Sequence, residues 1–157
     1  MEDVYYFAYS LHIDPKIFCR LNIAFRSRVI GFLPGYSISF NVLEDEFFLF
    51  EKRGLANIIP YPGGIVEGVL YSIDESALPK LDYESGVFSY KYYRKKVNVL
   101  TQTGKICSAV TYAAWPDATS KGLLPSGTYL KRLIAAVARN GISTHFRRWL
   151  ETHPTAV

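Results

Sequence analysis

Hydrophobic and polar positions follow one another in an order that predicts mostly strands first and helices last. Residues 4–9 form a β-branched and aromatic run of strand length, and residues 64–73 are typical of a buried central strand. Residues 28–41 predict two strand pieces, or one strand kinked at Pro34-Gly35. Residues 89–115 alternate at period two around a turn, which indicates a β-hairpin.

Helices are predicted between and after these strands. Asp14-Pro15 supplies an N-cap and a first helical proline for one short helix, and residues 75–82 predict another. After Pro125-Ser126, apolar residues recur at helical spacing until Asn140-Gly141, and a last helix follows a cap at Ser143. The pattern predicts an α+β fold, a small curved mixed sheet or barrel with flanking helices, two of them C-terminal.

Composition narrows the class of protein. The length of 157 residues, of which 49% are hydrophobic and 20% charged, predicts one globular domain over residues 1–157. The net charge of +4 is only mildly basic, and its short basic patches are typical of solvated faces, so no nucleic-acid partner is expected. Cys19 and Cys107 lie far apart, which predicts two reduced thiols. No apolar run has the length of a membrane span, so we expect a cytoplasmic protein without a membrane partner.

Familiar catalytic motifs are absent from the sequence, including the glycine-rich nucleotide-binding loops, the serine-hydrolase elbow and the zinc-protease helix. The three histidines are scattered, which disfavours a metal site, and neither cysteine lies at a strand-to-helix elbow, which disfavours a cysteine nucleophile. We therefore expect no metal and no cofactor. Candidate chemistry is confined to the carboxylates and to the loop after the first strand.

Five motifs in order along the chain resemble those of one known family. They are "YYFAYSLHI", "GFLPGYSISFN", "PGGIVEGVLYSID", "LPKLDYESGVFSYKYYRKKVNV" and "LLPSGTYLKRLIAAVARNGI". Together they resemble the gamma-glutamylcyclotransferase family from about Tyr5 to about Leu150. The resemblance implies a compact α+β fold with a pocket at the mouth of a small barrel. It also implies a small-molecule partner, a γ-glutamyl compound whose α-amine attacks its own γ-carbonyl, giving 5-oxoproline and releasing the attached amine or amino acid.

The chemistry of that reaction sets what the site must provide. An α-amino group has a pKa of about 8 and is mostly ammonium near pH 7, so a base must take a proton before the amine can attack. The leaving nitrogen then needs a proton back, and one carboxyl group can serve both steps. Backbone N–H groups in a tight loop can hold the α-carboxylate or the developing oxyanion.

The loop after the first strand departs from the family pattern. Family members have Tyr-Gly-Ser-Asn or Tyr-Gly-Ser-Leu there, whereas the substrate-binding candidates here are Tyr9, Ser10, Leu11 and His12. Either Ser10 replaces the glycine, or the glycine is deleted and the loop is one residue shorter. A serine puts the anion cradle in question if the backbone there needs a conformation that only glycine adopts easily. His12 is also a candidate base, with a structural loop histidine as the alternative, and Tyr129 matches a family tyrosine that lines the pocket or packs in the core.

The catalytic position departs as well. The family has its glutamate directly before a glycine, but here Ser85 stands at that position and Glu84 lies one residue earlier. A serine hydroxyl alone is no base near pH 7. On a regular strand the shift would turn Glu84 to the opposite face, whereas a turn or bulge could re-aim it toward the pocket. Glu84, displaced, and Ser85 are the catalytic candidates, and Asp82 is expected to be structural, capping a turn.

Two functions stay open. The first is an enzyme that cyclises a γ-glutamyl amine or amino acid, with Glu84 as the displaced acid/base and residues 9–12 as the anion cradle. The second is a catalytically silent or repurposed module of the same fold that binds a small molecule or a protein. Nucleic-acid binding through Tyr90, Tyr92 and Tyr93 is disfavoured, because aromatic residues on alternating strands usually pack.

Overall fold

Five strands close into a barrel in the computed structural model, which describes residues 3–44 and 53–156. They are β1 (Asp3–Ala8), β2 (Phe25–Leu43), β3 (Gly54–Asp74), β4 (Tyr92–Thr101) and β5 (Ile106–Ala114). Their order around the barrel is β1-β3-β2-β4-β5, and all neighbours are antiparallel except β1 and β5, which are parallel at Tyr6 and Val110. The predicted small mixed barrel is therefore confirmed.

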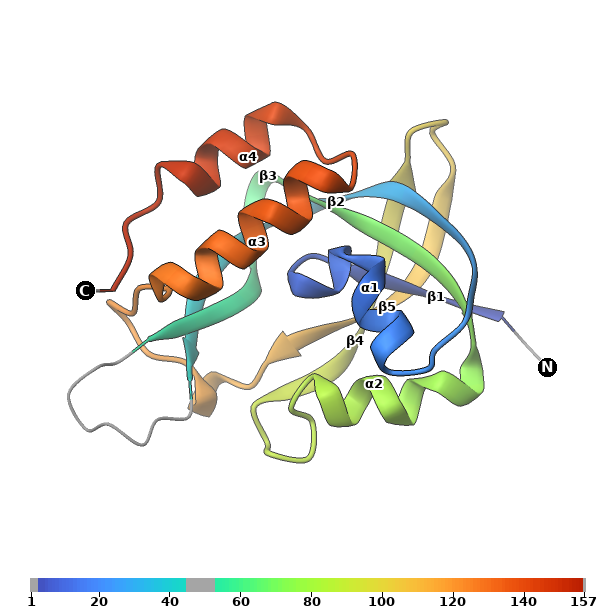
Figure 1. The fold of residues 1–157 in the computed structure, drawn as a ribbon, viewed down its shortest axis with the longest axis horizontal. Coiled ribbons are helices and arrows are strands. Elements are labelled where there is room, and N and C mark those ends of the chain that lie inside the picture. Colours follow the sequence, from blue (N-terminus) through green and yellow to red (C-terminus); the bar gives the residue numbers. More distant parts are fainter. Residues whose placement is uncertain (1–2, 45–52, 157) are drawn as a thin grey trace.

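Four α-helices flank the barrel (Figure 1). They are α1 (Pro15–Arg20), α2 (Leu78–Glu84), α3 (Gly127–Arg139) and α4 (Thr144–Glu151), with short 3-10 turns η1 (Leu11–Ile13), η2 (Glu75–Ala77) and η3 (Pro116–Ala118). The predicted caps at Asp14 and Ser143 are confirmed, and Ser126 caps a third helix, because these side chains accept hydrogen bonds from N–H groups in the first turns of α1, α4 and α3. Within the described ranges, no helix is long and apolar enough to cross a membrane.

Two local expectations are decided by the structure. The bend near Pro34 is one kinked strand, since β2 continues through a register shift against β3 between Pro34 and Tyr36. Residues 89–91, predicted to begin the hairpin, lie instead in turns, and β4 begins at Tyr92. The reason is that α2 continues to Glu84, so the chain needs these turns to reverse before it can enter the barrel.

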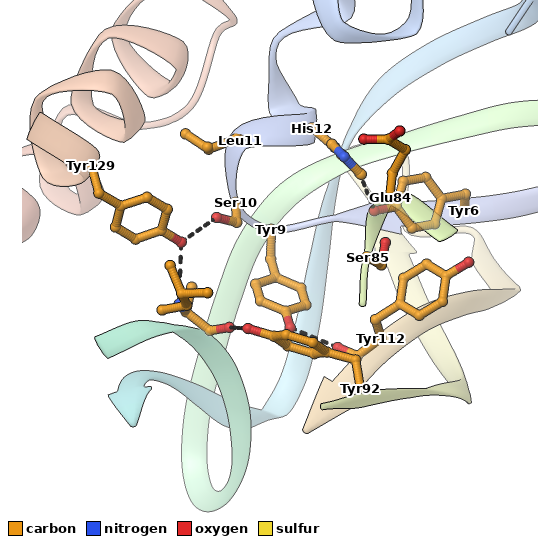
Figure 2. Close-up of a pocket in the computed structure, with 12 residues that line it drawn as sticks. Tyr6, Tyr9, Ser10, Leu11, His12, Glu84, Ser85, Tyr92, Tyr112 and Tyr129 are labelled. Atoms are coloured by element: carbon orange, nitrogen blue, oxygen red, sulfur yellow. Dashed lines mark hydrogen bonds between the residues drawn. The ribbon is translucent and has the colours of Figure 1, made fainter. Parts of the chain in front are cut away.

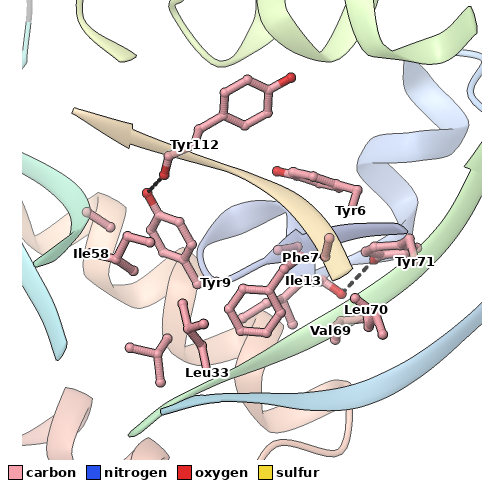
Figure 3. Close-up of a cluster of buried hydrophobic side chains, with 14 of the residues drawn as sticks. Tyr6, Phe7, Tyr9, Ile13, Leu33, Ile58, Val69, Leu70, Tyr71 and Tyr112 are labelled. Atoms are coloured by element: carbon pink, nitrogen blue, oxygen red, sulfur yellow. Dashed lines mark hydrogen bonds between the residues drawn. The ribbon is translucent and has the colours of Figure 1, made fainter. Parts of the chain in front are cut away.

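Aromatic and aliphatic side chains fill the barrel (Figure 3). Phe7 and Tyr71 are fully buried, and the ring of Tyr71 lies 4.1 Å from that of Phe18 on α1, so helix and barrel share one core. Gly68 lets β3 pass close to β1, because a Cβ there would lie 2.3 Å from the carbonyl oxygen of Ala8. Burial of this apolar surface is the main stabilising term of the fold.

Helix α2 is fastened to the barrel by the buried carboxylate of Asp82. Its oxygens accept from Arg94 Nε at 2.7 and 3.0 Å, from Arg94 Nη2 at 2.5 Å and from the Tyr112 hydroxyl at 2.6 Å. Burial alone would raise the pKa of Asp82, but these hydrogen bonds and the charge of Arg94 lower it overall. The residue is structural as expected, but the expectation that its side chain caps a turn is wrong, because the carboxylate joins α2 to β4 and β5.

We expect Asp82→Asn to lower the free energy of unfolding at pH 7 by about 1.5–3 kcal/mol, the usual range for hydrogen bonds to a charged group. Because the folded-state pKa of Asp82 is depressed, its contribution is present at neutral pH and is lost as the pH falls through the acidic range. Urea denaturation at pH 7 and pH 3 checks both points. Equal stability of the two proteins at pH 7 would contradict the assignment, and the difference should shrink at pH 3.

Candidate functional site

A pocket of about 230 Å³ opens where the loop after β1 meets the end of α2 (Figure 2). It is lined by Tyr6, Tyr9, Ser10, Leu11, His12, Leu55, Ala56, Glu84, Ser85, Tyr92, Tyr112 and Tyr129. Every site residue predicted from the sequence is among them. The structure thus brings together the loop, the α2 terminus and the start of α3, although they are separated by more than a hundred residues at the extremes.

Tyrosine hydroxyls hold the loop from Tyr9 to Ile13 in place. The Tyr9 hydroxyl donates to the Tyr112 carbonyl at 2.6 Å, and the Tyr71 hydroxyl lies 2.8 and 3.1 Å from the carbonyl oxygens of His12 and Ile13. Each link joins the loop to a barrel strand. The loop is therefore ordered before any ligand binds, which lowers the entropic cost of binding.

Ser10 and Tyr129 form a second anchor for the same loop. The Ser10 Oγ lies 2.8 Å from the Tyr129 hydroxyl, which also accepts the N–H of Ala56 at 3.1 Å (Figure 2). Ser10 has φ −131° and ψ −135°, so its φ is negative and does not require glycine. Ser10 thus needs no positive φ in this loop, and its hydroxyl gains a partner on α3.

Donors for an anion are present in this loop. Leu11 and His12 begin the 3-10 turn η1, and the first N–H groups of such a turn have no acceptor inside it. Both residues border the pocket. Backbone N–H groups in this arrangement suit a carboxylate or an oxyanion.

Glu84 and Ser85 both border the pocket because they lie at the end of a helix and not on a strand. Glu84 is the last residue of α2, and Ser85 follows as its C-cap with φ −87° and ψ −1°. Successive helical residues point about 100° apart, whereas successive strand residues point to opposite faces. Gly86 then turns the chain with φ +84°, a conformation that glycine adopts without strain. The displaced carboxylate consequently reaches the same cavity as the loop.

Comparison with known proteins identifies the family. The family model described as the AIG2-like family matches residues 65–150, which is more than half of the chain. The chain belongs to the AIG2-like family. The relationship to gamma-glutamylcyclotransferases that the motifs suggested is thereby confirmed, as distant homology over nearly the whole chain.

Individual relatives of this AIG2-like chain agree in sequence and in fold. The gamma-glutamylcyclotransferase of Bos taurus is 26% identical over 154 residues, covering 96% of this chain and 79% of that protein. The Homo sapiens gamma-glutamylcyclotransferase is 25% identical over 150 residues, covering 96% and 78%. A solved gamma-glutamyl cyclotransferase structure superposes with a TM-score of 0.82 at 24% identity, covering 98% of this chain and 89% of that one. A yeast glutathione-specific cyclotransferase, at 14% identity and a TM-score of 0.70 over 96% and 94% of the chains, shares the fold.

Three tyrosines of the AIG2-like pocket are not among the sequence candidates: Tyr6, Tyr92 and Tyr112. Strand alternation predicts which side chains point into a barrel, but not which end of the barrel stays open. The Tyr92 hydroxyl donates to the Ala56 carbonyl at 2.8 Å, so Tyr92 braces the pocket wall. Burial raises the pKa of all three phenols, which therefore stay neutral at physiological pH. In residues 3–44 and 53–156, no three His, Cys, Asp or Glu side chains gather as metal ligands.

His12 lies beside Tyr6, whose hydroxyl is 2.8 Å from His12 Nδ1. Burial lowers the pKa of His12 to about 4, so the imidazole is neutral near pH 7. A base with so low a pKa accepts protons poorly at neutral pH. The geometry therefore supports a hydrogen-bonding role for His12 over the alternative of a general base.

We expect the buried His12 to make the protein acid-sensitive. An unfolded histidine binds its proton near pH 6.5 and the folded one near pH 4, so stability falls as the pH drops through this window. The loss is at most about 3 kcal/mol. Denaturation of wild type and His12→Gln at pH 7 and pH 4 measures it, and the variant should lose less stability than wild type. Parallel pH profiles would contradict the assignment, and His145→Gln, an exposed position, is the control.

Proposed function

We propose that the protein cyclises a γ-glutamyl amine or amino acid to 5-oxoproline, with Glu84 as acid/base and residues 9–12 as the anion cradle. One observation carries this proposal: among the described residues that line the pocket, Glu84 supplies the only carboxylate, and it shares that pocket with the loop. Membership in the AIG2-like family and similarity to the bovine and human gamma-glutamylcyclotransferases support the reaction class.

The reaction needs three events that these groups can perform. Glu84 accepts a proton from the substrate's α-ammonium group, and the freed amine nitrogen attacks the γ-carbonyl carbon to close a five-membered ring. The negative charge that develops on the carbonyl oxygen is stabilised by N–H donors of the loop. The protonated Glu84 gives its proton to the leaving nitrogen, and the C–N bond breaks as the oxyanion re-forms the carbonyl. The extra proton of the ring nitrogen then passes through Glu84 to the released amine, so that 5-oxoproline and an ammonium product depart.

The charge of the pocket agrees with this substrate. In the described part of the pocket lining, His12 is neutral and the tyrosines are protonated, which leaves Glu84 as the only acidic or basic side chain that can carry a charge there. A carboxylate at one wall favours the α-ammonium group. Neutral N–H donors at the other wall can hold the α-carboxylate without a competing cation. No metal or organic cofactor is needed for these steps.

A second function is favoured by one specific observation. Ser85 takes the place of the family glutamate, and Glu84 is an exposed residue. An exposed carboxylate is less constrained than one packed against its reactant, and losing a positioned general base costs about 10²- to 10⁴-fold in rate. The alternative is therefore a silent module that binds a γ-glutamyl compound, or another small molecule or protein, in this pocket.

The catalytic proposal predicts that Glu84→Gln lowers the rate of 5-oxoproline release by about 10²- to 10⁴-fold. The assay uses a panel of γ-glutamyl amino acids and γ-glutamyl amines and follows 5-oxoproline by chromatography. Glu75→Gln is the matched control, because Glu75 is an exposed glutamate at the opposite end of the same helical segment, outside the pocket. Turnover that Glu84→Gln leaves unchanged would remove Glu84 from the mechanism.

Ser85→Glu separates the two functions. It restores a carboxylate at the position where the family has one. If wild type binds γ-glutamyl compounds in calorimetry but releases no 5-oxoproline, and Ser85→Glu does release it, the protein is a binding module that kept its pocket. If wild type already turns over, added activity in this variant leaves the first proposal in place.

A further inference from the structure

A second cavity, of about 150 Å³, lies between α1 and α3. We call it the basic cleft. Its charged lining residues are Lys16 and Arg20 from α1, Arg132 and Arg139 from α3, and Asp14. With four cations and one carboxylate, the formal charge of the cleft is 4 − 1 = +3, whereas the net charge of the whole chain is +4.

The cations of the basic cleft are not neutralised by the described part of the protein. Ion pairs lie elsewhere in the described protein, where they join Arg26 to Asp3 and Asp74, Arg94 to Asp82, and Arg147 to Glu151. None of the four cleft cations has a described carboxylate within 4.0 Å. Four positive charges are therefore gathered around one small cavity.

The one acidic side chain in the cleft is already committed. Asp14 Oδ1 accepts the backbone N–H of Lys16 at 3.0 Å and caps α1. Lys16 and Arg20 are four residues apart on α1, and like charges at that spacing repel and destabilise a helix. An anion between α1 and α3 would relieve this repulsion.

The shape of the basic cleft leaves room for such an anion. Ala135 and Ala136 line it between Arg132 and Arg139, and because their side chains are small they leave space in the cavity. Arginine presents a planar set of donors that matches phosphate oxygens in pairs, and lysine adds a mobile point charge. The combination suits a compact group with several oxygens and more than one negative charge.

We propose that the basic cleft binds a small, free, multivalent anion of the phosphate type, such as inorganic phosphate or pyrophosphate. The site adjoins the γ-glutamyl pocket, because Leu11 lines both cavities. It does not depend on the proposed reaction, since none of its charged residues lines that pocket. Its occupancy is therefore testable without any turnover.

Isothermal titration with pyrophosphate at low ionic strength tests the site on wild type and on Arg132→Gln/Arg139→Gln. We expect saturable binding with one site per chain, weakened about tenfold or more in this variant, because it removes two charged hydrogen-bonding partners. The control Lys96→Gln/Lys131→Gln changes net charge equally. Lys131 is an exposed neighbour on α3 and Lys96 is exposed on β4, and neither lines the cleft, so we expect its affinity to stay within about twofold of wild type.

Thermal unfolding provides a second readout that also checks folding. Pyrophosphate should raise the melting temperature of wild type and of the control, but not that of the cleft variant, which should itself melt cooperatively. Equal stabilisation of wild type by sodium chloride at matched ionic strength would overturn the proposal, because general screening would then explain the effect. So would equal loss of affinity in the cleft and control variants. If the wild-type protein binds pyrophosphate but releases no 5-oxoproline from γ-glutamyl compounds, the result counts against the proposed function alone.

Discussion

Buried tyrosine hydroxyls that hold the loop from Tyr9 to Ile13 are the constraint on which the rest of the site depends. Three hydroxyls, from Tyr9, Tyr71 and Tyr129, fasten that loop to the barrel and to α3. A polar group that loses its partner in such a buried place costs about 1–3 kcal/mol, so each link resists local opening. The loop N–H groups can therefore present a fixed pattern to a ligand.

The other wall of the pocket is fixed by a different kind of contact. Asp82 is held by Arg94 and Tyr112, and Glu84 and Ser85 follow it within the same turn of the chain. The helix is short, so its end cannot move far while Asp82 stays bonded. Tyr112 belongs to both walls, since its hydroxyl binds Asp82 and its carbonyl oxygen accepts from Tyr9. This single strand residue sets the separation between the cradle and the carboxylate.

Much of the fold could be predicted from local pattern. Alternation predicted the hairpin around Thr103-Gly104. The caps at Asp14 and Ser143, and the Pro125-Ser126 pair, predicted where three helices begin. These features depend on neighbours in the sequence. Closure of the barrel by pairing of β1 with β5 depends instead on residues about a hundred positions apart, which periodicity does not reveal.

Most residues of the candidate site could be predicted from the sequence, but their arrangement in space could not. The family resemblance pointed to the loop, to Glu84 and Ser85, and to Tyr129, and all of them border the pocket. It could not show that Glu84 ends a helix, because "ESG" fits a turn before a strand equally well. Tyr6, Tyr92 and Tyr112 were missed since tyrosine is common in this chain, and position along a strand does not reveal which hydroxyl finds a partner.

Barrel closure between the first and last strands has a consequence for how the chain folds. The bridge between Tyr6 and Val110 must wait until both ends of the barrel are present, and contacts of such long sequence separation slow folding. During synthesis, the segment that carries the loop would leave the ribosome long before its partner on β5. The β4–β5 hairpin can form locally and early, whereas the pocket can assemble only in the final closure step.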